Sequence, residues 1–332
     1  MSSSFISCDW GTSSFRLRLV SHGDLSIQRQ VKRNQGIKDV FSQCRDRSLD
    51  DRCDAFEEIL REATDELFRN TEPPSRTIFL SGMASSSIGW KELPYTSLPF
   101  PLTGESLVYD AITIRTANQQ SFKVLLFSGI ASETEIMRGE ECELIGIASL
   151  PALAEAMEDC LVVLPGTHSK HVSIRDRRIT DFHTVMTGEL FDTISKHTIL
   201  SASLTFSSGM IESPETPANQ AAFASGVELA RDLGFARSLF QIRTRSVLHQ
   251  KSSESNRWFL SGLLIGSEWL SLLEQDTRCP IVLAAGSQFS AAYQSAAQIL
   301  ELDDRIISLT SNEVTQAAIR GHAKLQETFA NQ

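Results

Sequence analysis

The sequence predicts an α/β protein of two similar domains, each a mixed five-stranded sheet flanked by helices, with a cleft between the domains. Two observations support this class. A short apolar run, a glycine-threonine turn and an alternating run occur at residues 5–20 and again at 161–175. One strand–turn–strand unit used in both halves would give this pattern. The 332 residues are also enough for two cores of ordinary size.

The first half of the chain opens with strand-like runs around the first turn. In the second of these runs, Phe15, Leu17 and Leu19 alternate with arginines, as in a half-exposed strand. A helical apolar stripe then follows Asp50 and Asp51. The predicted elements are strands 5–9, 15–20 and 25–31, a helix that ends before Pro73, strand 77–80, a loop of small residues at 81–90 and strand 123–127.

The second half repeats this order with more helices. Its last buried strand ends in Ala285, Gly286 and Ser287, directly before another helical pattern. Segments rich in serine, threonine and proline are typical of loops. The predictions are strands 161–164, 171–175, 178–183, 281–284 and 305–309, helices 187–199, 220–233, 258–275, 288–300 and from about 312, and loops 201–219 and 244–256.

Three strands, a helix, a strand, a helix and a strand, in two copies, is the layout of the actin-like ATPase (ribonuclease H-like) fold shared by sugar kinases and Hsp70. We therefore predict a substrate-side domain at residues 1–129 and a nucleotide-side domain at 130–332. The last helix, 312–330, is expected to pack back on the first domain. Hinges are expected near 128–133 and before residue 312.

Composition and charge limit the classes of partner and the cellular location that we expect for this protein. The net charge is −10 and no dense Lys/Arg block occurs, so nucleic acid and anionic membranes are poor partners. Six scattered cysteines form no Cys-x-x-Cys pair, unlike a zinc site or a disulfide scaffold. No secretory signal is visible. The longest apolar segment, Trp258–Leu273, is too short and too polar to span a bilayer. These features predict a cytoplasmic protein.

The first glycine turn is a candidate phosphate site. Asp9 ends the first strand, where a carboxylate can hold Mg²⁺, and Gly11, Thr12 and Ser13 follow it. A glycine turn with hydroxyl neighbours presents backbone N–H groups to an anion, and Arg16 adds a cation. The alternative is a capping aspartate in an ordinary β-turn.

The second turn, Gly166 and Thr167, lacks an equivalent acid, because Leu164 occupies the position of Asp9. Lys170 is either a phosphate-binding cation or a solvent-facing lysine. His168 and His171 do not suggest a metal pair, because side chains three apart on an extended chain point to opposite faces.

Phosphoryl transfer to a hydroxyl needs a proton acceptor and positioned cations. Glu140 or Glu141 could be that acceptor, with Arg138 near the substrate or phosphate, although an acidic helix start gives the same pattern. Thr187, before a glycine at a helix start, could bind an anion or act as an N-cap. Gly286 and Ser287 would let an adenine or ribose approach the backbone.

Several longer segments together resemble the 2-dehydro-3-deoxygalactonokinase family, a sugar-acid kinase branch of the actin-like superfamily. The most specific are the Met-Arg-Gly-Glu-Glu and Thr-Val-Met-Thr-Gly-Glu-Leu runs, and the segments keep the family's order from residue 5 to the C-terminal region. They are residues 8–13, 81–91, 137–141, 165–170, 181–190 and 259–268.

The resemblance implies transfer of the ATP γ-phosphoryl group, with Mg²⁺, to the 6-hydroxyl of 2-dehydro-3-deoxy-D-galactonate. It implies Glu140 as the base; related sugar kinases carry aspartate there, and Asp181 and Glu189 are rivals. It places Arg138 or Lys91 at the substrate carboxylate. Residues 13–14 and 84–86 depart from the family pattern, which usually has Asn or Gly near these places. The implied substrate contacts are Ser85, Ser87, Trp90, Lys91, Thr187 and Glu189.

Two alternatives keep the fold. One is a kinase of another 2-keto-3-deoxy or aldonic sugar acid, because the residues do not define the C4 stereochemistry of the substrate. The other is an ATP-gated sensor that phosphorylates nothing and has no sugar-dependent ADP release. The chain is either a monomer or a homodimer in which an apolar helix such as 258–273 packs on its copy.

Overall fold

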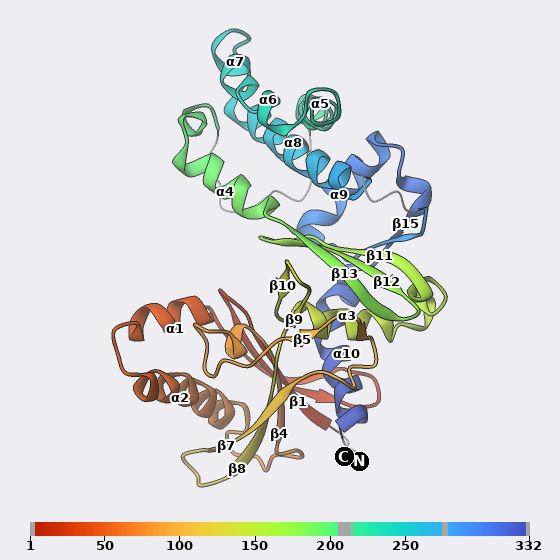
Figure 1. The fold of residues 1–332 in the computed structure, drawn as a ribbon. Coiled ribbons are helices and arrows are strands. Elements are labelled where there is room, and N and C mark those ends of the chain that lie inside the picture. The colour runs from red at the N-terminus through yellow and green to blue at the C-terminus, as the bar shows by residue number, and fades with distance from the viewer. Residues whose placement is uncertain (1–3, 205–213, 215, 274–277, 330–332) are drawn as a thin grey trace. The chain divides into compact units, whose positions relative to one another are not determined.

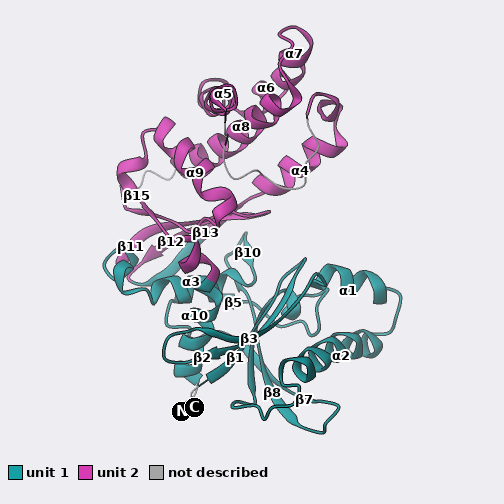
Figure 2. Cartoon of the chain, turned by 180° about the vertical axis from the view of Figure 1, so that it is seen from behind, with its two compact units in different colours: residues 1–157, 177–181, 316–332 teal, residues 158–176, 182–315 magenta. Residues whose placement is uncertain are grey.

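A computed structural model describes residues 4–204, 214, 216–273 and 278–329. The chain forms two compact units (Figure 2). Unit 1 comprises residues 1–157, 177–181 and 316–332, and unit 2 comprises residues 158–176 and 182–315. Unit 1 therefore extends beyond residue 129, where the sequence suggested a boundary, and it includes most of the last helix.

Unit 1 contains a mixed six-stranded sheet in the order β3-β2-β1-β4-β8-β7. The first two strands form an antiparallel hairpin around the first glycine turn, and β1, β4 and β8 run parallel. Strand β7 closes the sheet antiparallel to β8. The bounds are β1 Ser4–Trp10, β2 Phe15–Ser21, β3 Ile27–Arg33, β4 Thr77–Gly82, β7 Tyr109–Arg115 and β8 Ser121–Phe127.

The two faces of this sheet have different partners, because alternate residues point to opposite sides. Ile6 and Leu80 join the core that includes residues of α1 (Ile37–Cys44) and α2 (Leu49–Leu67). On the opposite face, Ser7 and Ser81 bond the ring of His322, at 2.8 and 3.0 Å. That histidine belongs to α10 (Ser311–Phe329), which lies with α3 (Glu140–Ala148) on this side of the sheet (Figure 1).

Helix α2 has the apolar stripe that the sequence predicts. Its N-cap, Ser48, accepts a hydrogen bond from the Asp51 N–H, and Asp50 and Asp51 complement the positive end of the helix dipole. The buried Phe56 packs edge-on against Trp10 of β1, with ring centroids 5.6 Å apart. This contact packs α2 directly against the strand that carries Asp9.

The segment between β4 and β8 differs from the expected repeat. All of residues 83–120 are described, and they contain η1 (Met83–Ser85), two short strands and β7, but no α-helix. Pro94, Pro99 and Pro101 lack the N–H group that a helix interior requires. Three short strands form a small sheet in the order β10-β9-β5, and β6 pairs with the start of β13. The bounds are β5 Thr96–Ser97, β6 Phe100–Pro101, β9 Ile130–Ala131 and β10 Ile136–Met137.

The main strands of unit 2 follow the order β13-β12-β11-β14-β15. This order reproduces β3-β2-β1-β4-β8 of unit 1, including the antiparallel hairpin around the glycine turn. The repeated order confirms the predicted fold class, two actin-like ATPase domains. The strands are β11 Asp159–Leu164, β12 Ser169–Arg175, β13 Arg178–Val185, β14 Ile281–Leu283 and β15 Ile306–Ser308.

Helices of unit 2 pack on one face of its sheet (Figure 1). In the described ranges, no helix is long and apolar enough to cross a membrane. The longer helices are α4 Thr187–His197, α5 Pro217–Leu233, α8 Ser253–Leu273 and α9 Ser287–Ile299, and the shorter ones are α6 Phe235–Ser238, α7 Gln241–Val247, η4 Ile199–Ser203 and η5 Asp303–Arg305. Two further short helices, η2 Pro151–Leu153 and η3 Ala156–Glu158, lie where the first segment of unit 1 ends.

Two predicted loops have different outcomes. The predicted loop at 244–256 is wrong, because it includes the end of α7 and the start of α8. Long-range contacts stabilise this short helix: Arg245 donates to Asn256 and lies over the ring of Phe259. Much of the predicted loop at 201–219 lies outside the described residues; its first part is the end of η4 and its last part is the start of α5.

Helices α5 and α8 approach closely through glycines. A Cβ atom added at Gly262 would lie 2.0 Å from the Phe223 carbonyl oxygen, and one at Gly226 would lie 2.3 Å from the Phe259 carbonyl oxygen. Such contacts force backbone shifts. The central core of unit 2 therefore tolerates no side chain at either position.

We expect Gly262→Ala to lower the free energy of unfolding by about 1–3 kcal/mol, the usual cost of overpacking a core. Urea denaturation followed by circular dichroism measures it. Gly23→Ala is the control, because an added Cβ there has no heavy atom within 4 Å. Equal denaturation midpoints for the two variants would contradict the close packing of α5 on α8.

Candidate functional site

The first glycine turn joins a carboxylate and an arginine. Asp9 pairs with Arg16 across the β1–β2 hairpin, and Arg16 Nη1 donates to Asp9 Oδ2 at 2.9 Å. The turn is closed by the Gly11 N–H, which donates to the Ser14 carbonyl at 2.9 Å. Thr12 and Ser13 are exposed at its tip. The predicted phosphate-binding residues of unit 1 are thus contiguous and accessible.

Helix α1, which the sequence did not predict, fixes this turn. The Ile37 and Lys38 N–H groups donate to the carbonyls of Gly11 and Thr12, at 3.0 and 3.1 Å. A Cβ at Gly36 would lie 2.1 Å from the Thr12 carbonyl oxygen. Only glycine therefore allows the helix to start directly against the turn.

The first turn of α3 carries three glutamates. The helix begins after Gly139, whose φ of +105° favours glycine and whose added Cβ would lie 3.3 Å from the Gly82 Cα. Glu140 is half-buried. Glu141 is 1% exposed; its Oε2 accepts from the Gly139 N–H at 2.7 Å, whereas its buried Oε1 has no hydrogen-bond partner.

Burial and mutual repulsion raise two carboxyl pKa values in this turn. Burial, together with the neighbouring Glu140, raises the pKa of Glu141 to about 8. Burial also raises the pKa of Glu143 to about 8, with contributions from Glu140 and Asp9. The charges of Glu140 and Asp9 both act on the Glu143 carboxyl, so the start of α3 lies close to the first glycine turn.

Sequence reasoning missed Glu143. The available signal was its spacing, because residues three apart on a helix lie on the same face. The sequence indicates Glu140 as a candidate base and an acidic helix start as the alternative, and the structure shows that the segment is a helix start. Once α3 begins at Glu140, the spacing places Glu143 beside it.

Arg138 lies in a buried position just before α3. Its Nη1 donates to Ser85 Oγ at 2.8 Å and its Nη2 donates to the Leu93 carbonyl at 3.0 Å. Its guanidinium also lies over the Tyr95 ring, 4.0 Å from the centroid. Arg138 therefore connects the start of α3 to the loop after β4.

The four predicted substrate contacts in the loop after β4 differ in exposure. Ser85 is buried against Arg138, and Trp90 is 4% exposed within the core of unit 1. Ser87 and Lys91 are exposed, and Lys91 Nζ lies 2.5 Å from Asp110 Oδ2. Ser87 and Lys91 are therefore the accessible pair.

The second glycine turn packs against the start of α4. A Cβ at Gly188 would lie 2.7 Å from the Gly166 carbonyl oxygen, and the Glu189 N–H donates to the Thr167 carbonyl at 3.1 Å. The Glu189 carboxylate also contacts His168. The turn and the first turn of α4 thus form one assembly in unit 2.

Lys170 extends from this turn as a buried cation. Its Nζ donates to Thr184 Oγ1 at 2.8 Å, and the residue is 6% exposed. Thr187 is also buried and donates its hydroxyl to Glu268. Asp181, a rival base, is an exposed residue of β13.

Gly286 and Ser287 lie where β14 leads into α9. Gly286 is the N-cap residue, and an added Cβ would have no heavy atom within 4 Å. Ser287 is exposed. This helix start therefore has an open side, which a bound nucleotide requires.

The repeated strand order, with a glycine turn in each unit, defines the class: a protein of the actin-like ATPase fold. The family model for 2-keto-3-deoxy-galactonokinase (DGOK) matches residues 9–322. The chain therefore belongs to this family, as its motifs suggested. It is an enzyme, a sugar-acid kinase with ATP as cosubstrate.

Individual relatives are similar over nearly the whole chain. The 2-dehydro-3-deoxygalactonokinase of Escherichia coli (strain K12) is 31% identical over 329 residues, 97% of this chain and 98% of that protein. The probable 2-dehydro-3-deoxygalactonokinase DgoK1 of Rhizobium meliloti (strain 1021) is 30% identical over 327 residues, 96% of each. A crystal structure of a candidate 2-dehydro-3-deoxygalactonokinase from Sinorhizobium meliloti is 28% identical, covers 98% of this chain and 99% of its own, and has a TM-score of 0.77.

Proposed function

We propose that this kinase transfers the γ-phosphoryl group of ATP to the 6-hydroxyl of 2-dehydro-3-deoxy-D-galactonate, a step in the breakdown of D-galactonate. The match to the Escherichia coli 2-dehydro-3-deoxygalactonokinase over nearly the whole of both chains carries the proposal. The carboxylates of unit 1 supply the required chemistry. The product would be the 6-phosphate of the same acid, a substrate for aldol cleavage.

In unit 1, Glu140 is the proposed base that accepts the proton of the attacking hydroxyl. A base must be ionised to act. Because its pKa is raised to about 8, the Glu143 carboxyl is mostly protonated at neutral pH. Glu143 then adds little negative charge beside Glu140, where the incoming phosphates already repel carboxylates.

In unit 2, we assign the Gly166–Thr167 turn to the phosphates of ATP. Backbone N–H groups of such a turn bind anions, and Lys170 adds a positive charge close by. We assign Gly286 and Ser287 to the nucleoside, because their helix start has an open side. Gly11, Thr12, Ser13 and Arg16 are the proposed phosphate contacts of unit 1.

Asp9 is the proposed carboxylate ligand of Mg²⁺. Among the described residues, no three His, Cys, Asp or Glu side chains form a group that could hold a metal ion. A Mg²⁺ ion that enters with ATP would take one or two carboxylates and fill its other positions with phosphate oxygens and water. Bound Mg²⁺ would supply charge stabilisation to the transferring phosphoryl group.

For the sugar acid, we propose contacts from Ser87 and Lys91, the accessible pair. The substrate carboxylate needs a cation. Lys91 fits this role better than Arg138, whose guanidinium is buried against Ser85 and Tyr95. We propose that Ser85 and Trp90 hold this loop in place. We propose that Glu189 and Thr187 act beside the second glycine turn.

The test is a coupled ADP-release assay with Mg²⁺-ATP and three acceptors: 2-dehydro-3-deoxy-D-galactonate, its gluconate epimer and plain aldoses. We expect kcat/KM for the galactonate-derived acid to exceed the others by at least about tenfold, or 1.4 kcal/mol. A preference for another sugar acid would contradict the substrate assignment. Saturable ATP binding with no sugar-dependent turnover would favour the nucleotide-gated sensor.

A further inference from the structure

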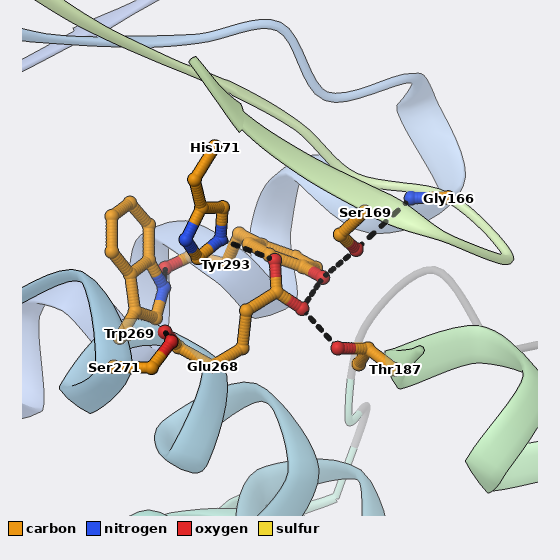
Figure 3. A network of polar contacts seen from close by, with 8 residues as sticks. All are labelled: Gly166, Ser169, His171, Thr187, Glu268, Trp269, Ser271 and Tyr293. Carbon is orange, nitrogen blue, oxygen red and sulfur yellow. Dashed lines mark hydrogen bonds and ion pairs between the residues drawn. The ribbon is translucent and has the colours of Figure 1, made fainter. Parts of the chain in front are cut away.

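A buried carboxylate on α8 joins four elements of unit 2. Glu268 is 1% exposed. Its Oε1 accepts a hydrogen bond from His171 Nε2 of β12, at 3.1 Å. Its Oε2 accepts from the Tyr293 hydroxyl of α9, at 2.7 Å, and from the Thr187 hydroxyl at the start of α4 (Figure 3).

This carboxylate is an unusual residue for its position. The α8 residues around it, including Leu264, Trp269 and Leu272, belong to the hydrophobic core of unit 2. Withdrawing a charge from water costs several kcal/mol, and well-packed apolar residues often give equal or greater stability at such a position. Core stability alone is therefore a poor reason for a glutamate here.

Two branches lead from Glu268 to the second glycine turn. In the first, Tyr293 lies 3.3 Å from Ser169 Oγ, which accepts from the Gly166 N–H at 3.3 Å (Figure 3). In the second, Thr187 is followed by Gly188, which packs against the Gly166 carbonyl. Both branches end at Gly166, so one side chain sets the position of the turn from two directions.

We propose that Glu268 is a positioning residue, which holds the Gly166–Thr167 turn and the first turn of α4 in the orientation that binds the phosphates of ATP. This inference rests on the proposed assignment of the turn to the nucleotide. Glu268 does not touch ATP itself, because it is buried and both its oxygens accept hydrogen bonds from protein donors. It acts through Tyr293, Ser169 and Thr187.

Tyr293→Phe tests the first branch alone. The change removes one hydroxyl and leaves Glu268 bonded to His171 and Thr187. We expect the Kd for a fluorescent ATP analogue, measured with Mg²⁺, to rise about three- to tenfold, or roughly 0.7–1.4 kcal/mol. The KM for ATP should rise in parallel, with the KM for the sugar acid within about twofold of wild type, because the turn orients the nucleotide alone.

Glu268→Gln tests the source of both branches. An amide has only one acceptor oxygen, so it cannot accept from all three donors at once. We expect the Kd for the ATP analogue to rise at least tenfold. Ser238→Ala is the matched control: this buried hydroxyl of unit 2 donates to the Leu229 carbonyl and has no bond to the network. Its ATP affinity should stay within about twofold of wild type.

The outcomes separate the two proposals. A wild-type protein that binds no ATP analogue would contradict the assignment of the turn to the nucleotide. If wild type binds and both variants bind with unchanged Kd, the positioning role is wrong. If Glu268→Gln does not fold, Tyr293→Phe decides. A variant that loses kcat while keeping its ATP affinity and KM for ATP would also overturn the positioning role.

Discussion

Glu140→Gln should lower kcat for the sugar acid by about 10²- to 10⁴-fold, the usual contribution of a general base. The amide keeps the size of the side chain but cannot accept the hydroxyl proton. Affinity for ATP should stay within about twofold, because Glu140 is not among the residues assigned to the nucleotide phosphates in either unit. The ADP-release assay gives kcat, and the fluorescent analogue gives the Kd.

Glu143→Gln is the matched control, because the residue lies one turn further along α3 and shares the same electrostatic environment. Since most Glu143 is protonated at neutral pH, removing its proton-accepting oxygen should cost less than about tenfold in kcat. Two results would move the base away from Glu140. One is a larger loss for Glu143→Gln, and the other is a larger loss for Glu189→Gln.

The paired hairpins made the fold predictable. A hairpin leaves a local signal, since alternation and a glycine turn lie within about fifteen residues, and two copies indicate duplication. The argument from duplication fails for residues 83–120, because it places a helix there and the prolines of this segment exclude one. Helix α7 escaped because Arg245 is held by residues on α8, a contact that no local pattern shows.

The candidate site was predictable where its residues are adjacent in sequence. Asp9 and Gly11 belong to the motif of the first hairpin, and Gly166 and Lys170 belong to the motif of the second. Glu268 appears in the sequence only as a polar interruption of an apolar helix. Its partners lie 97, 81 and 25 residues away, so their convergence depends on the tertiary packing of unit 2.

Burial of Glu141 should make the protein less stable as the pH rises from 5 to 8. The pKa of this carboxyl is about 8 in the folded protein, above the 4.5 of an unperturbed glutamate. The folded state therefore holds a proton that the unfolded state has released over this range. Because the native state binds more protons, the free energy of unfolding falls as pH increases, on the order of 3 kcal/mol from this group.

Glu141→Gln should remove this part of the pH dependence, because the amide resembles the protonated acid and its oxygen can still accept from the Gly139 N–H. Urea unfolding at pH 5, 6, 7 and 8 should give a flatter profile than wild type, with the variant more stable at pH 8. Glu58→Gln, an exposed change on α2, is the control and should leave the slope unchanged. A variant that kept the wild-type slope would show that Glu141 ionises normally in the folded state. The unpartnered Oε1 argues against this, since a charged oxygen without a donor would be buried at high cost.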